Sequence, residues 1–152
     1  MIAVASGSAV SSFLDAVIRH SDQFSEIILC APFIDMDTAQ RLSTLVLRTQ
    51  RVSCGITIIT APVGNKALTT VVTCPERFAV LKIRVRPNIH AKAYLAIARG
   101  RRGRSEAMIT SANLPAPAFF TNFELGIHAT TRSANGRTLV AQIRNTLSRL
   151  SN

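Results

Sequence analysis

Tryptophan is absent from this chain, tyrosine occurs once, and aromatic residues make up only 5% of the sequence. The core is therefore expected to consist of Ile, Val, Leu and Ala side chains. No apolar stretch reaches the ~20 residues that a membrane-spanning helix needs. The first ten residues also lack a basic segment followed by a long apolar run, so we expect no signal peptide, no membrane partner and a cytoplasmic location.

Cysteine is scarce as well, and Cys30, Cys54 and Cys74 lie far apart in the sequence. No CxxC pair occurs, and no cysteine–histidine cluster has the spacing of a zinc site. These observations favour buried thiols in a reducing compartment over disulfides or a metal centre. We expect neither a metal ion nor a cofactor.

Acidic residues are the third deficit: 8 Asp and Glu stand against 18 Lys and Arg, which gives a net charge of +10. Such an excess favours a polyanionic partner, because phosphates that bind Lys and Arg release their counterions. Arg greatly outnumbers Lys, and its guanidinium group suits bidentate contacts with phosphate. Nucleic acid is the expected partner, while solubility alone and attraction to anionic membranes are the competing interpretations.

The rest of the composition is that of a folded protein, with 47% hydrophobic residues over a length of 152, which suits a single domain of residues 1–152. Apolar residues at helical spacing predict helices, and short apolar runs predict buried strands. The expected helices span residues 8–20, 35–50, 66 into the seventies, and 133–150. The expected strands span residues 26–33, 52–60, 81–86, 91–98, 107–111 and 123–130, and residues 61–65 are expected to form a turn. This alternation predicts an α/β fold with a mixed, largely parallel β-sheet sandwiched between helices.

The side chains that carry chemistry lie between His90 and Glu124. On a strand, His90 and Lys92 point the same way, because alternate residues share a face. With Ser111 and Asn113 from the next strand, they form a pocket in which an ammonium group and directed hydrogen bonds hold an oxyanion. A neutral imidazole there can attack phosphorus, provided that a carboxylate holds its other ring nitrogen, and Glu124 is the best candidate.

This order of residues resembles the HKD motif and its trailing elements in the phospholipase D superfamily. The matching elements are His90-x-Lys92, Ser111-x-Asn113 and Asn122-x-Glu124-Leu-Gly. The strand that ends in Ala-Pro-Phe at residues 31–33, with the helix and strand that follow it, is similar to the first half of one family repeat. The resemblance implies cleavage or exchange of phosphodiesters without a metal ion.

Carried over by motif position, the resemblance also implies a role for each residue. His90 is the nucleophile or the general acid, Lys92 and Asn113 bind the phosphate, Ser111 supports it, and Glu124 orients His90. Two positions depart from the family pattern. Its acidic residue falls on Ile97, and the Gly that usually precedes Ser-x-Asn is Thr110. The missing acid is generally a structural partner, and the tyrosyl-DNA phosphodiesterase branch also lacks it.

The chain contains one such motif, whereas the family's chemistry needs two histidines, one that attacks and one that protonates the leaving oxygen. A chain of this length cannot hold two repeats. A homodimer with twofold symmetry places both copies of His90 at one shared site, and small nucleases of this family resemble that arrangement.

Basic residues cluster in two places near the motif. Both clusters are candidate contacts with nucleic-acid backbone. The first is a Gly-containing loop with Arg99, Arg101, Arg102 and Arg104. The second is a strand on which cations alternate with apolar residues, and it contains Lys82, Arg84 and Arg86. The leading hypothesis is a homodimeric endonuclease that cleaves DNA or RNA through a phosphohistidine. A nucleic-acid-binding module that has lost catalysis is the second hypothesis, and a phospholipid phosphodiesterase is the third.

Overall fold

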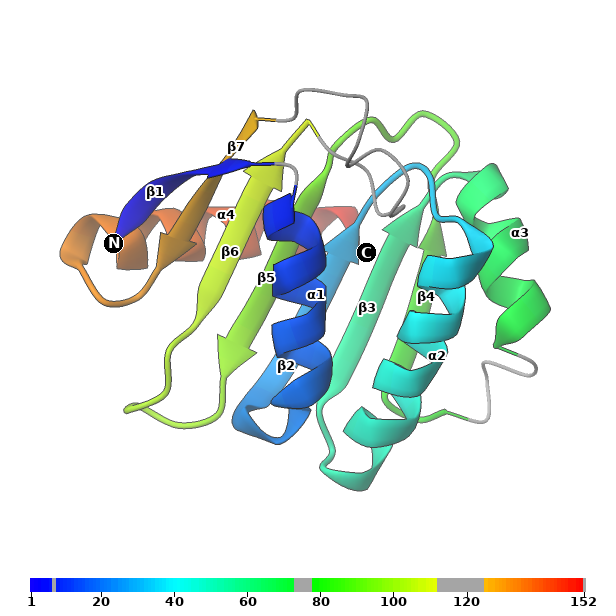
Figure 1. Ribbon diagram of the computed structural model, residues 1–152, viewed down its shortest axis with the longest axis horizontal. Coiled ribbons are helices and arrows are strands. Elements are labelled where there is room, and N and C mark those ends of the chain that lie inside the picture. Colours follow the sequence, from blue (N-terminus) through cyan, green and yellow to red (C-terminus); the bar gives the residue numbers. More distant parts are fainter. Residues whose placement is uncertain (7, 73–77, 112–124, 152) are drawn as a thin grey trace.

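The computed structural model describes residues 1–6, 8–72, 78–111 and 125–151. A seven-stranded sheet with the strand order β1-β7-β6-β5-β2-β3-β4 runs through the molecule (Figure 1). The strands are β1 (Ile2–Ser6), β2 (Phe24–Cys30), β3 (Gly55–Thr60), β4 (Leu81–Val85), β5 (Ala93–Ala98), β6 (Glu106–Thr110) and β7 (Leu125–Thr130). The helices are α1 (Ser8–Arg19), the short 3-10 helix η1 (Ser21–Gln23), α2 (Met36–Arg51), α3 (Pro62–Val71) and α4 (Ala134–Leu150).

Helices cover the two faces of the sheet unequally. Helices α1, α2 and α3 pack on one face, where Leu14, Leu42 and Leu68 join a cluster with strand residues such as Ile58 and Tyr94. Helix α4 lies on the other face and packs Ile143 and its apolar neighbours against a second cluster of strand residues. Figure 1 shows α1 and α2 in front of the sheet and α4 behind it. The expected sheet between helices is therefore confirmed.

The direction of the strands decides which loops meet. Strands β2, β3 and β4 are parallel, so they all end at the same end of the sheet, which we call the carboxyl end. Strand β5 runs antiparallel to β2 and pairs Ala93 with Cys30, so β5 starts at the carboxyl end. Strand β5 then finishes at the opposite, amino end, where Ala98 pairs with Phe24.

The mixed sheet is confirmed, but the share of parallel pairing is smaller than expected. Only the pairs β2–β3 and β3–β4 are parallel, while the pairs that link β2, β5, β6, β7 and β1 are antiparallel. The antiparallel hairpin of β5 and β6 accounts for part of the difference. Strand β1, which the sequence analysis did not identify, adds another antiparallel pair by placing Ile2 opposite Ala129.

Most helix boundaries follow from local signals. The carboxylate of Asp35 accepts a hydrogen bond of 2.8 Å from the Thr38 backbone and caps α2, and Ser133 caps α4 in the same way. The expected turn at residues 61–65 is wrong, because α3 begins at Pro62. Proline suits the first helical position, since its missing N–H has no helical partner there and its φ angle is already helical.

Candidate active site

The His90–Lys92 segment lies at the carboxyl end of the sheet, immediately before β5. The Lys92 carbonyl accepts a hydrogen bond of 3.1 Å from the Thr110 backbone, and the Cys30 thiol lies 3.6 Å from the Ala91 carbonyl. His90 is exposed and Lys92 is half-buried. The expected strand at residues 91–98 begins only at Ala93, so strand alternation does not set the directions of the His90 and Lys92 side chains.

Ser111 follows β6 at the same end and lies against the start of β7. Its backbone N–H donates to the Leu125 carbonyl at 3.0 Å, and its Oγ accepts from the Leu125 N–H at 3.1 Å. The close approach of the strands here requires Gly126, because a Cβ at that position would lie 2.6 Å from the Ile109 carbonyl oxygen. Ser111 is thus held beside the residue that directly follows Glu124 in the chain.

The site predicted from the sequence is therefore only partly visible. The structure brings the backbone of Lys92 against Thr110, and Ser111 against Leu125, across the neighbouring strands β5, β6 and β7. Asn113, Asn122 and Glu124 lie outside the described residues. The carboxyl end of parallel strands is where ligands of α/β proteins usually bind. The placement of His90, Lys92 and Ser111 agrees with that rule.

A hollow of about 310 Å³ lies beside Lys92, between the sheet and α4. Ala93 and Ile109 line it from the sheet, and α4 contributes mainly apolar side chains, including Leu147. Cys30 lies fully buried below the motif segment, and burial raises the pKa of its thiol to about 11. This thiol is therefore neutral at pH 7 and is not a nucleophile.

Ile97, which replaces the acidic residue of the family motif, lies on β5 opposite Glu26 of β2. Glu26 forms an ion pair with Arg144 of α4, with Oε2 and Nη2 2.7 Å apart. A carboxylate therefore remains in this part of the α4 face, on the neighbouring strand. The ion pair of Glu26 with Arg144 links α4 to the sheet, so α4 has an acidic partner even though position 97 is Ile.

The predicted cations of β4 are spread along the strand. Arg86 follows β4 at the carboxyl end, and the turn of residues 86–89 leads directly to His90. Arg84 Nε donates to the Ser151 carbonyl at 2.7 Å, at the end of α4, so this side chain has a structural role. Lys82 is exposed and lies nearer the amino end. Arg86 is the cation of this strand that lies closest to the motif along the chain.

The basic loop occupies a different place from the one expected. The sequence analysis put residues 99–104 beside the phosphodiester site, but they join β5 to β6 at the amino end, on the order of 20 Å from Lys92 at ~3.3 Å per strand residue. The Arg99 backbone N–H donates to the Gln23 carbonyl at 2.7 Å, and its guanidinium donates to the Phe24 carbonyl at 3.2 Å. Because β5 runs away from the site, its loop lies at the far end.

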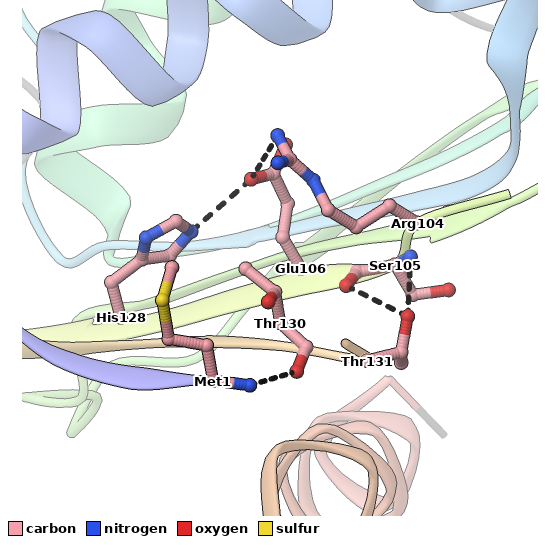
Figure 2. A network of polar contacts seen from close by, with 7 residues as sticks. All are labelled: Met1, Arg104, Ser105, Glu106, His128, Thr130 and Thr131. Atoms are coloured by element: carbon pink, nitrogen blue, oxygen red, sulfur yellow. Dashed lines mark hydrogen bonds and ion pairs between the residues drawn. The ribbon is translucent and has the colours of Figure 1, made fainter. Parts of the chain in front are cut away.

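A buried polar network was missed by the sequence analysis. Glu106 of β6 is buried, and its Oε2 lies 3.1 Å from His128 Nε2 and 3.8 Å from an Arg104 nitrogen (Figure 2). No spacing signals the pair, since Glu106 and His128 become neighbours only through the register of β6 and β7.

Two further features concern metals and membranes. Among the described residues, no group of three or more His, Cys, Asp and Glu side chains could hold a metal ion. In the same part of the chain, no helix combines the length and the apolar character that crossing a membrane requires.

No protein-family model and no curated protein matches the sequence. Solved structures do match the fold. Polyphosphate kinase from Porphyromonas gingivalis aligns with a TM-score of 0.68 at 14% identity, over 99% of this chain and 26% of the kinase. The archaeal chromatin protein TrmBL2, described as having a novel mode of DNA binding, aligns with a TM-score of 0.62 at 14% identity, over 97% of this chain and 50% of that protein.

Nuc from Salmonella typhimurium, a phospholipase D family member, is similar over nearly its whole length. The TM-score is 0.60 at 17% identity, and the alignment covers 95% of this chain and 92% of Nuc. The chain spans only part of the first two proteins, so their whole-protein activities do not transfer to it. The extent of the match to Nuc shows that this chain has the phospholipase D fold, which the resemblance of its motifs to that superfamily implied.

Proposed function

We propose that this protein is a metal-independent phosphodiesterase, a nuclease that acts on DNA or RNA, with an active site completed by a second copy of the chain. One observation carries the proposal. Three segments meet at the ends of the adjacent strands β5, β6 and β7, at the carboxyl end of a phospholipase D fold. They are the segment that holds His90 and Lys92, the position of Ser111, and the start of β7. The net charge of +10 supports a polyanionic substrate.

The chemistry proceeds in two displacements. One His90 attacks phosphorus through a free ring nitrogen, and the bond from phosphorus to the leaving oxygen breaks while the partner's His90 donates a proton to that oxygen. Water then attacks the phosphohistidine and gives up a proton to the partner's His90, which restores both rings. Lys92 and Asn113 balance the charge of the phosphoryl oxygens, and Glu124 holds the attacking ring in the reactive tautomer.

An exposed apolar surface supports the second copy. The surface, which we call the apolar face, lies on the α4 side of the sheet beyond the reach of α4. Val4 is 78% exposed and Leu125 is 69% exposed, and the remaining members are about half exposed. The full set is Ile2, Val4, Ile109, Leu125 and Ile127. Contiguous exposed side chains of this kind mark interaction surfaces in soluble proteins.

The position of the apolar face fits a shared site. Ile109 belongs both to this face and to the hollow beside Lys92, so the apolar surface continues up to the motif segment. Two copies that pack this face against itself around a twofold axis bury the apolar side chains. The same packing brings the two His90 segments toward the axis.

The decisive experiment is a cleavage panel of plasmid, single-stranded DNA and RNA in excess EDTA. We expect cleavage of at least one substrate at an undiminished rate, and complete loss of cleavage in His90→Ala with unchanged circular dichroism. A wild-type protein that cleaves nothing, or cleavage that EDTA abolishes, contradicts the proposal. Light scattering at the assay concentration should show a dimer, and a strict monomer contradicts the shared site.

A second candidate function is nucleic-acid binding without catalysis. The similarity of the fold to TrmBL2, a chromatin protein, and the departures at Ile97 and Thr110 favour it. This candidate predicts salt-sensitive binding that survives His90→Ala, together with no turnover of any substrate by the wild type.

A further inference from the structure

Arginines from four parts of the chain meet at the amino end of the sheet, opposite the motif segment. Helices α1 and α2 both end there, next to the loop that joins β5 to β6, as the lower side of Figure 1 shows. The residues after β7 add a further arginine. We call the exposed set the basic pole; it comprises Arg19, Arg51, Arg101, Arg102, Arg104 and Arg132.

Most acidic side chains near the basic pole are already engaged. Glu106 is held by His128 and Arg104, and Glu26 is held by Arg144. Asp22 in η1 is exposed. Two more arginines of this end, Arg48 and Arg99, donate to backbone carbonyls and are left out of the set because they have structural partners. Glu106 partly offsets the charge of Arg104, so the excess of positive charge comes mainly from the other five arginines of the pole.

Hydrogen bonds hold the loop of the basic pole in place (Figure 2). The Ser105 N–H donates to Thr131 Oγ1 at 3.1 Å, and the Thr131 N–H donates to the Ser105 carbonyl at 3.0 Å. Glu106 lies between His128 and Arg104 on the same side of the sheet. Gly100, with a φ angle of 81°, makes the turn that a residue with a side chain would strain. A cationic surface built this way loses little entropy when it binds.

A hollow of about 360 Å³ opens between α1 and this loop. Arg104 and Arg132 line it together with His20 of the segment after α1, and Glu106 forms part of its wall. The two arginines reach the hollow from different loops, so a phosphate group entering it meets donors from both sides.

We propose that the basic pole is a second nucleic-acid contact, which holds the sugar-phosphate backbone away from the site of cleavage. The identity of the polyanion rests on the proposed function. Lys92 and Arg99 lie on the order of 20 Å apart along β5 at ~3.3 Å per residue. That distance corresponds to about six nucleotides at ~3.4 Å per step. The pole therefore acts on long substrates and has no effect on a small diester.

The test removes two loop charges and compares two matched variants. Arg101→Ser/Arg102→Ser alters the pole at exposed turn positions. Lys66→Ser/Arg149→Ser removes the same charge from exposed positions on α3 and α4. Binding to a 30-nucleotide DNA and RNA is followed by fluorescence anisotropy over a salt series, and hydrolysis of bis(p-nitrophenyl) phosphate is measured in parallel. Arg19 and Arg51 are left unchanged because cations at helix C-termini also stabilise the helices. Arg149 lies in the last turn of α4, so the urea midpoints of both variants are compared with that of the wild type before binding is measured.

We expect the pole variant to bind several-fold more weakly and its slope of log affinity against log salt to fall by roughly 1 to 2. The control variant should stay close to wild type, and all three proteins should hydrolyse the small diester equally. Cleavage of a 30-mer should fall in the pole variant, while cleavage of a four-nucleotide substrate should not.

Three results overturn the inference. Equal losses of affinity in both variants show that only net charge matters, and unchanged affinity in the pole variant shows that the loop does not bind. Absence of binding by the wild type also removes the second contact. The proposed function fails separately, through the absence of diester hydrolysis by the wild type, so the two failures are distinguishable.

Discussion

The two faces of the sheet differ in how completely one chain covers them. Three helices pack on the first face, where Leu42 and Tyr94 are fully buried. Of the helices in the described part of the chain, only α4 packs on the other face, where Val4, Ile109 and Ile127 remain at least 46% exposed. The first face is covered by helices and forms a closed core. The second is a core where α4 crosses it and a solvent-facing apolar surface elsewhere.

This difference teaches that burial within the chain and burial within an assembly are separate requirements. Ile127 pairs with Ile109 on β6 and Val4 on β1, so three strands contribute apolar side chains in one row. Such a row is typical of an interior position rather than of an exposed one. The α4 face thus provides the physical reason to expect a second copy.

The largest expected effect comes from adding charge to the apolar face. Ile127→Asp should convert a dimer into a monomer and abolish diester cleavage, because a buried carboxylate without a partner is costly at an interface. Sedimentation velocity and the EDTA cleavage assay measure both effects. Leu47→Asp is the matched control, since Leu47 is 55% exposed on α2, on the covered side. If both variants stay dimeric and active, or both become monomeric and inactive, the two faces do not differ in their role in the dimer.

Truncation of one side chain on each face sharpens the comparison. Leu42→Ala should lower the free energy of unfolding by about 2–5 kcal/mol, because it opens a cavity in a closed core. Ile127→Ala should cost less than about 1 kcal/mol in protein dilute enough to be monomeric, since little buried contact is lost. Urea denaturation measures both. Equal costs in the monomer mean that Ile127 is buried within the chain.

A cap at the carboxyl end should have a smaller effect. Asp35→Ala removes the acceptor for the Thr38 N–H and should cost about 1 kcal/mol of stability. Asp35→Asn should retain most of that stability, because an amide oxygen also caps a helix. Urea midpoints of the two variants provide the comparison, and equal losses exclude a capping role.

The smallest effect near neutral pH concerns the thiols, one from each core. Burial raises the pKa of both Cys30 and Cys54 from 9.0 to about 11. The unfolded chain loses these protons first, so the stability is fully present below pH 9 and falls as the pH rises toward 11. Urea midpoints at pH 8 and pH 10.5 measure the fall, which should be smaller in Cys30→Ala. In a Cys74→Ser background, rapid labelling of the native protein at pH 8 contradicts the raised pKa values.

Local pattern predicts the parts of the fold that depend on neighbours in sequence. The apolar periodicity of α1, α2 and α4 gave these helices nearly to the residue. Strand β1 could not be found in this way, because its partner β7 lies more than 100 residues away. The α/β class was nevertheless predictable from the alternation of strands and helices, and the resemblance of the motifs to a known superfamily implied the phospholipase D fold.

The residue roles in the candidate site stay predictions, and only the placement of the described segments can be compared with the structure. The motif named His90, Lys92 and Ser111, and the structure places their segments at one end of the sheet. The position of the basic loop depended on the direction of β5, which no local pattern reveals. The pairing of Glu106 with His128 depended on the register of β6 and β7 in the same way. The roles of Asn113 and Glu124 stay predictions.

The turn between β5 and β6 has a practical consequence for engineering. It projects from the end of the sheet farthest from the His90 segment, and its tip at Arg101 and Arg102 is exposed. A bulky tag or fluorophore inserted there covers the basic pole without lengthening any connection that reaches His90. Such an insertion should therefore weaken binding of long nucleic acids and leave hydrolysis of a small diester unchanged.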